Sequence, residues 1–132
     1  MFTHVHLGSN DVARSKQFYD ALFAALGGAH SWKDSERDRW FWAKDGRFLV
    51  VGRPLDEGDA QPGNGFTVGF DVSSVEQGNA WHAAGLANGG TSCEEPPGIR
   101  DHSAEGGIYL AYLRDPDGNK LCALKFMGPL KV

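Results

Sequence analysis

Two histidines separated by a single residue stand near the start of the chain, and they are the first side chains suited to chemistry. His4 and His6 lie in the stretch FTHVHLGS, in which polar and apolar residues alternate. Alternation with a period of two indicates a β-strand, so both imidazoles should share one face. A neutral imidazole binds transition metals, and near neutral pH it also serves as a general base. The pair predicts a metal ligand, an acid–base group or a polar lining on that face.

The thiol of Cys122 is a second candidate, because it interrupts an apolar strand that follows the turn DPDG. A cysteine thiolate attacks electrophiles or binds zinc, but a nearby cation or helix N-terminus must first lower its pKa. Only Lys120 shares its strand face. We interpret Cys122 as a small apolar residue, with nucleophile and metal ligand as the alternatives.

Aromatic side chains and one arginine are candidates for ligand binding. Trp40 and Trp42 share one face of the predicted strand RWFWA, where they belong either to the core or to a cleft on which a planar ligand stacks. Tyr109 and Tyr112 point to opposite faces of their strand, so at most one reaches a cleft. Arg100 lies in the long loop EPPGIRDHSAEGG, where it either clamps a ligand carboxylate or phosphate or pairs with a neighbouring acid.

The remaining histidines have structural interpretations. His82 belongs to a predicted helix and is expected to pack against its surroundings. His30 and His102 lie in or near loops, where we expect surface positions.

The elements that must position these residues occur twice in the same order. Each set has a strand, a glycine-terminated helix and three further strands. Asn10 or Asp11 is expected to cap the first helix, and Ser73 with Glu76 fits a capping box at the second. The first set lies at 2–9, 12–28, 29–32, 39–43 and 47–52, and the second at 66–72, 75–90, 91–94, 108–114 and 120–126.

This order is a weak internal repeat. A shift that aligns His4 with Thr67 also aligns Leu7 with Phe70 and Phe18 with Trp81. Two tandem βαβββ units of the α+β class follow, with one helix covering the outer face of each sheet. The helix-facing residues should be Val5, Leu7, Val68, Phe70 and Val72. The concave face should carry His4, His6, Thr67, Gly69 and Asp71.

These ordered stretches resemble the vicinal oxygen chelate superfamily, which includes glyoxalase I, extradiol dioxygenases and bleomycin- or fosfomycin-resistance proteins. The resemblance rests on HVHLGSNDVARSKQFYDALFAALGG, FTVGFDVSSVEQGNAWHAAGLANGG and YLRDPDGNKLCAL, and it covers nearly the whole chain. It implies one domain over 1–132, built of modules at about 1–55 and 65–130. These should form a curved mixed sheet around a cleft, in a protein that is a homodimer.

In metal-using members of this family, one position on the first strand and one on the last strand of each module hold a divalent ion. Carried onto this sequence, they fall on His4, Thr67, Cys122 and near Val50. A catalytic zinc or iron site needs about three protein ligands. The resemblance therefore implies no cofactor, and a Zn, Ni, Mn or Fe ion on His4 with Cys122 is the alternative.

The overall composition excludes several classes of partner. Hydrophobic residues make up 41% and charged residues 23%, with a net charge of −4, which is typical of a soluble globular protein and disfavours a nucleic-acid partner. No signal peptide and no apolar run near the length of a membrane helix is evident. We therefore expect a cytoplasmic protein without a membrane partner.

Two function classes follow from these observations. The first is a metal-free binder of a small organic metabolite or drug, in a cleft lined by His4, His6, Trp40, Trp42, Thr67, Arg100, Tyr109 and Cys122. The second is a glyoxalase-like enzyme, a metal-dependent lyase, isomerase or dioxygenase, in which the ion acts as a Lewis acid. A metal-free enzyme that uses His4 or His6 as acid or base is a third reading. Metal analysis separates the first two.

Overall fold

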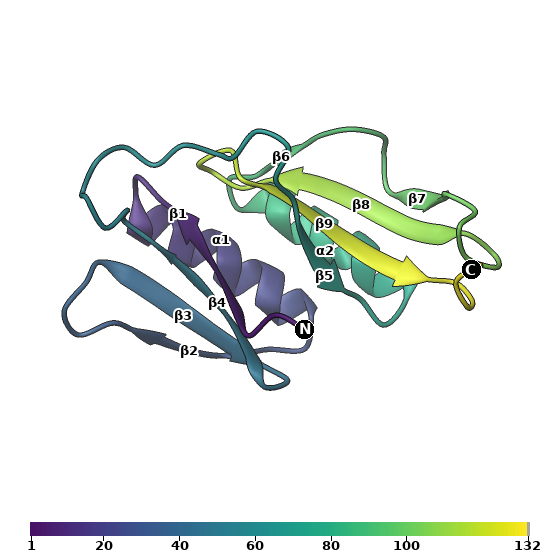
Figure 1. The fold of residues 1–132 in the computed structure, drawn as a ribbon, viewed down its shortest axis with the longest axis horizontal. Coiled ribbons are helices and arrows are strands. Elements are labelled where there is room, and N and C mark those ends of the chain that lie inside the picture. Colours follow the sequence, from purple (N-terminus) through teal and green to yellow (C-terminus); the bar gives the residue numbers. More distant parts are fainter. Residues whose placement is uncertain (132) are drawn as a thin grey trace.

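A computed structural model describes residues 1–131 and places two helices behind two sheets (Figure 1). In the first module, β1 pairs in parallel with β4, which pairs antiparallel with β3, and β3 pairs with β2. The predicted α+β class and the first βαβββ unit are confirmed. The elements of this module are β1 (His4–Gly8), α1 (Val12–Ala25), β2 (His30–Lys33), β3 (Arg39–Lys44) and β4 (Arg47–Gly52).

The second module repeats this topology. Strand β5 pairs in parallel with β9, β9 pairs antiparallel with β8, and both β6 and β7 pair with β8. Part of the long loop predicted around Arg100 is therefore a strand, β7. The elements are β5 (Val68–Asp71), α2 (Val75–Ala87), β6 (Thr91–Ser92), β7 (Gly98–Arg100), β8 (Ile108–Arg114) and β9 (Lys120–Phe126).

Side chains that accept backbone hydrogen bonds begin both helices. The Asp11 carboxylate accepts from the amide of Arg14 at the start of α1, as predicted. At α2 the predicted capping box is wrong by one residue: the Ser74 hydroxyl accepts from the amide of Gln77, and the Gln77 side chain accepts from the amide of Ser73. Glutamine completes the reciprocal pair as well as glutamate does, so the two registers are hard to separate in the sequence.

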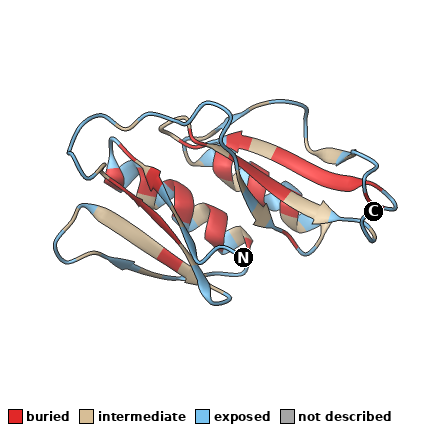
Figure 2. Ribbon diagram, in the orientation of Figure 1, coloured by how far each residue is buried: buried red, intermediate tan, exposed pale blue. Residues whose placement is uncertain are grey.

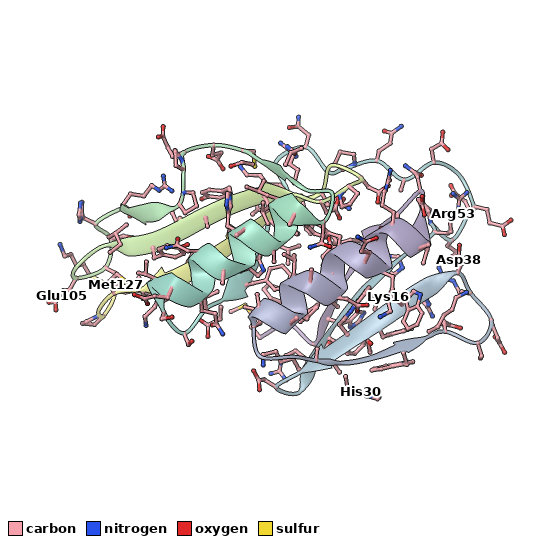
Figure 3. The ribbon with its side chains drawn as sticks, turned by 180° about the vertical axis from the view of Figure 1, so that it is seen from behind. Lys16, His30, Asp38, Arg53, Glu105 and Met127 are labelled. Carbon is pink, nitrogen blue, oxygen red and sulfur yellow. The ribbon has the colours of Figure 1, made fainter. Side chains whose placement is uncertain are left out.

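A main core joins the helices and both sheets, and a small second cluster consists of Ala104, Ile108 and Leu110. Residues coloured as buried lie along both helices and the adjoining strands (Figure 2), and they form this main core. Seen from behind, the two helices lie side by side in front of the sheets (Figure 3), and they pack against each other. Neither described helix has the length and apolar character needed to cross a membrane. The helix-facing set is confirmed, because the core includes or is packed by Val5, Leu7, Val68, Phe70 and Val72.

The turn between β8 and β9 fastens the second module to the first. The Asp117 carboxylate accepts from the amide of Asn10 at 2.9 Å and from the Arg14 guanidinium at 3.0 Å. The Asn119 amide donates to the carbonyl of Gly8 at 3.0 Å. The DPDG turn therefore does more than reverse the chain, since it fixes where β9 lies relative to β1.

Candidate functional site

The face of the first sheet that points away from α1 carries both histidines of β1. His4 lies opposite Phe48 and His6 opposite Val50 on the neighbouring strand β4. Val50 in turn lies opposite Phe41 of β3. Residues paired across strands point to the same face, so these side chains share one surface. Both histidines are exposed.

Five stacked or tilted rings cross this face from β2 to β1, and we call them the aromatic ladder. The ring of Trp32 stacks on Phe41 with centroids 5.0 Å apart, and the ring of Phe48 stacks on His4 at 4.8 Å. Phe41 and Phe48 are 5.9 Å apart and tilted by 42°. The ladder consists of His30, Trp32, Phe41, Phe48 and His4.

The ladder is open to solvent, and charged groups border it. Trp32 is 39% exposed, whereas the other three tryptophans are buried or half-buried. The Arg39 guanidinium lies 5.1 Å from the centroid of Phe41 and donates to the carboxylate of Asp34 at 2.8 Å. Contiguous exposed apolar surface with a polar rim often marks a binding site.

His6 stands beside the ladder with an altered acidity. Desolvation lowers its pKa below 6.5, and the charges of Arg39 and Arg37 lower it further. The imidazole is therefore neutral near pH 7 and presents one hydrogen-bond donor and one acceptor.

Cys122 lies on the concave face of the second sheet, opposite Gly69 on β5 and Tyr112 on β8. It is 6% exposed, and burial raises the pKa of its thiol. The cation on its strand face, Lys120, forms an ion pair with Glu94. The side chain is thus a neutral, enclosed thiol, which is poorly suited to nucleophilic attack.

The donor set does not fit a complete metal site. Within residues 1–131, no three His, Cys, Asp or Glu side chains gather closely enough to hold an ion. Nδ1 of His4 lies 2.9 Å from the hydroxyl of Thr3. Besides His4 and Cys122, the family resemblance implies two further ligand positions, and they carry Thr67 and Val50. The Val50 side chain is apolar and buried. We derive no chemical step through a metal.

Two tryptophans predicted to be cleft candidates lie on the opposite side of the sheet. Trp42 pairs across strands with the core residue Leu49, is 1% exposed, and donates its indole N–H to Asp20 at 3.0 Å. Trp40 packs against the core, with the Lys16 ammonium 4.4 Å from its ring centroid. Placing them on the concave face is therefore wrong, because contacts with α1 draw this face of β3 inward.

Tyr109 also requires correction. Its side chain is fully buried against α2, where its hydroxyl donates to Asn79 at 2.8 Å. Tyr112 is the tyrosine of this strand that shares the concave face with Cys122. Arg100 donates to the backbone carbonyls of Pro96 at 2.6 Å and Leu110 at 3.1 Å, so its guanidinium braces β7 against β8.

Two other histidines, His82 and His30, can be compared with their predictions. His82 packs as expected: it is 8% exposed, lies 3.1 Å from the Ser92 hydroxyl, and its pKa is lowered by burial. His30 is exposed but belongs to the aromatic ladder, which sequence reasoning missed. The available signal was the alternation of His30 and Trp32 with Ser31 in β2.

A mainly apolar pocket of about 340 Å³ lies where the two modules meet. Phe48 contributes both to this pocket and to the aromatic ladder. Gly69 and Phe70 line it from the second module, and Trp42 lines it from the helix side. The volume falls within the range of small-molecule sites.

Comparison with known proteins gives concordant results. A sequence profile of the Glyoxalase/Bleomycin resistance protein/Dioxygenase superfamily matches residues 2–123. A glyoxalase/bleomycin resistance protein from Albidiferax ferrireducens T118 is 50% identical, with 94% of this chain and 97% of that chain covered and a TM-score of 0.83. No curated protein matches the sequence.

More distant structures share the fold. A glyoxalase/bleomycin resistance protein/dioxygenase family enzyme from Burkholderia phytofirmans PsJN is 17% identical, with 95% and 98% of the chains covered and a TM-score of 0.73. A glyoxalase-related enzyme from Fulvimarina pelagi is 19% identical over 100% and 97% of the chains, with a TM-score of 0.73.

Proposed function

Because the chain belongs to the Glyoxalase/Bleomycin resistance protein/Dioxygenase superfamily, we propose that it binds a small, planar organic molecule on its aromatic ladder without a complete metal site. The observation that carries this proposal is the run of stacked rings on the concave face of β2, β3, β4 and β1. A metabolite or a drug with a flat ring system is the class of ligand that such a surface accommodates.

The rings supply affinity at low entropic cost. Phe41 and Phe48 are half-buried, so few rotamers are lost when a ligand covers them. Offset stacking of an aromatic pair contributes about 0.5–1.5 kcal/mol beyond the area buried. The pocket between the modules, which Phe48 also lines, would enclose an apolar part of the ligand that reaches it.

Polar groups beside the ladder would orient the ligand. The neutral imidazole of His6 offers a donor and an acceptor, and Arg39 lies over the face of Phe41. A heteroaromatic ring with a hydrogen-bonding edge matches this combination better than a purely hydrocarbon ring does.

A metal-dependent lyase, isomerase or dioxygenase is the second candidate. The observation in its favour is the exposed imidazole of His4 on the concave face. It requires at least one ligand beyond His4 and Cys122. Stoichiometric Zn, Ni, Mn or Fe in the purified protein that is lost in His4→Ala would favour this candidate over metal-free binding.

Tryptophan fluorescence tests the proposal directly, because Trp32 is the only one of the four tryptophans on the ladder. Titration with quinoline and naphthalene derivatives should quench the wild-type emission in a saturable manner. Trp32→Phe should remove the quenching, whereas the matched variant Trp40→Phe, altered on the helix side, should retain it. Saturable quenching that persists in Trp32→Phe would contradict binding on the ladder.

The proposal includes a cytoplasmic homodimer. Light scattering after size-exclusion chromatography should give twice the protomer mass of 14.3 kDa. A mass equal to the protomer across the micromolar range would contradict the dimer and leave the ladder proposal intact.

A further inference from the structure

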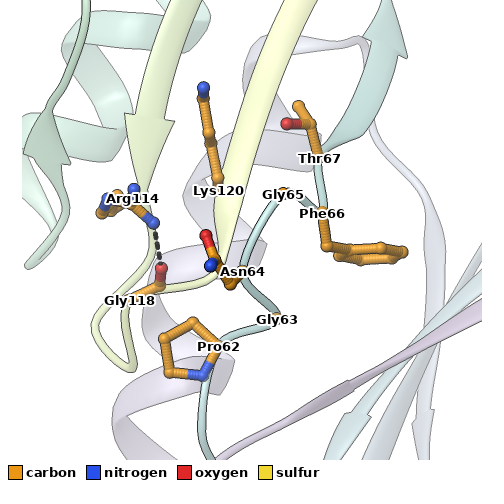
Figure 4. Close-up of a pocket in the computed structure, with 9 residues that line it drawn as sticks. All are labelled: Pro62, Gly63, Asn64, Gly65, Phe66, Thr67, Arg114, Gly118 and Lys120. Atoms are coloured by element: carbon orange, nitrogen blue, oxygen red, sulfur yellow. Dashed lines mark hydrogen bonds between the residues drawn. The ribbon is translucent and has the colours of Figure 1, made fainter.

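A second pocket, of about 610 Å³, lies at the other end of the second sheet, where the segment connecting the modules passes the β8–β9 turn. Asn64 and Thr67 line it from the connecting segment, and Arg114 and Lys120 line it from β8 and β9 (Figure 4). None of the aromatic ladder residues lines this pocket. What it binds is therefore independent of the proposed function.

Two cations lie side by side on the strands that line this pocket. Arg114 and Lys120 are directly paired on neighbouring strands and point to the same face. Like charges in such a pair are destabilising unless something compensates them. Lys120 has an acidic partner in Glu94, whereas Arg114 forms no salt bridge to any described residue. The pocket therefore retains a net positive charge.

The nearby carboxylates of the turn are already committed elsewhere. Asp115 accepts from the hydroxyl of Tyr19 at 2.5 Å, and Asp117 accepts from Arg14 and from the Ser15 hydroxyl. Both therefore serve the junction with α1. Among residues 1–131, the exposed carboxylate of Glu94 is the acidic group that pairs with one of the pocket's cations, so it is the competitor that an incoming anion meets.

Hydrogen bonding holds the Arg114 guanidinium in place and leaves donors available. Its Nη1 donates to the carbonyl of Gly118 at 2.8 Å, which leaves the edge formed by Nε and Nη2 for a bidentate contact. The hydroxyl of Thr67 and the side-chain amide of Asn64 make no hydrogen bond to another described residue. Together with Lys120, these groups offer donors from both the strands and the connecting segment to an anion in the pocket.

We propose that this pocket binds the phosphate group of a small phosphorylated organic molecule. A phosphate monoester carries about two negative charges and three acceptor oxygens. The free edge of Arg114, the Lys120 ammonium, which it would share with Glu94, and the two neutral donors offer partners to all three oxygens. The volume of the pocket leaves room for a small organic group attached to the phosphate.

The test is a ¹H–¹⁵N titration with inorganic phosphate at constant ionic strength, with acetate as a parallel arm. Phosphate should shift the amides of Gly63, Gly65 and Thr67 saturably, and acetate should bind at least tenfold more weakly. Arg114→Ala should weaken phosphate binding by about tenfold or more, since a charge-assisted contact is lost. Because the shifts are measured on the unaltered protein, they do not depend on how well the variant folds.

The matched control is Arg47→Ala. Arg47 is also exposed and donates to a glycine carbonyl, that of Gly46 at 3.1 Å, but lies outside this pocket. The control should leave phosphate affinity unchanged. If Arg114→Ala and Arg47→Ala weakened phosphate binding equally, general charge attraction would account for the binding, and the proposal would be overturned. Unshifted Gly63 and Gly65 amides, or acetate binding as tightly as phosphate, would also overturn it.

Discussion

The hydroxyl of Tyr19 on α1 donates a 2.5 Å hydrogen bond to the carboxylate of Asp115, which begins the turn between β8 and β9. Both side chains are buried, and the bond joins the two modules. Asp115 also accepts from the amides of Asp117 and Asn119, which shapes the turn itself. One carboxylate thus fixes a local turn and the position of the module that carries Cys122.

Removing this contact should destabilise the protein. Tyr19→Phe leaves a buried carboxylate without one of its donors, and we expect a loss of about 1–3 kcal/mol in the free energy of unfolding. Urea denaturation measures it. Tyr112→Phe is the matched control, because the Tyr112 hydroxyl makes no hydrogen bond to a described residue; it should change stability by less than about 0.5 kcal/mol. Equal losses in both variants would refute the structural role of the Tyr19–Asp115 bond.

The acidity of His6 gives a second prediction. Its folded-state pKa lies below 6.5 because of desolvation, Arg39 and Arg37, so the folded protein binds fewer protons there than the unfolded chain. The contribution of His6 to the free energy of unfolding should therefore increase as the pH rises from the lowered pKa to 6.5. Proton NMR titration of the imidazole should show the lowered value, and Arg39→Gln should raise it.

The same titration has a charge-matched control. Arg47→Gln removes an equal charge from the neighbouring strand β4, yet Arg47 is not among the groups that shift His6. It should leave the pKa of His6 where it is. A His6 pKa at or above 6.5 in the unaltered protein would contradict the described surroundings.

The enclosed thiol of Cys122 should react slowly. Its raised pKa and 6% exposure predict alkylation by iodoacetamide at pH 7.5 only when the protein unfolds, whereas half-buried Cys93 should react faster in the folded state. Mass spectrometry of tryptic peptides resolves the two sites. Rapid labelling of Cys122 in the folded Cys93→Ser protein would instead mark an activated nucleophile.

Local patterns in the sequence predict the fold well, because they act within single elements. The alternation around Val5 and Leu7 sets which face of β1 is buried, and Asp11 caps α1 as expected. At α2, Gln77 and Glu76 both suit the capping box, and in the structure the Gln77 side chain accepts from the amide of Ser73. Neighbouring residues with equivalent chemistry therefore limit the precision of the prediction.

The candidate site is less predictable, because it depends on which face of a two-sided strand is covered. Strand β3 carries Trp40 and Trp42 on one face and Phe41 on the other, so its alternation does not identify the core side. The contact of Trp42 with Asp20 and Tyr19 on α1 decides this. The ladder also brings together rings from four strands, whose register is set by pairing across the sheet.

Metal-free binding on the aromatic ladder is tested most directly by calorimetric titration of EDTA-dialysed protein with a quinoline derivative that quenches Trp32. We predict unchanged affinity after dialysis and a loss of about tenfold or more in Phe41→Ala, which removes the central ring. Affinity that disappears on dialysis, returns with added divalent metal and survives Phe41→Ala would contradict the account.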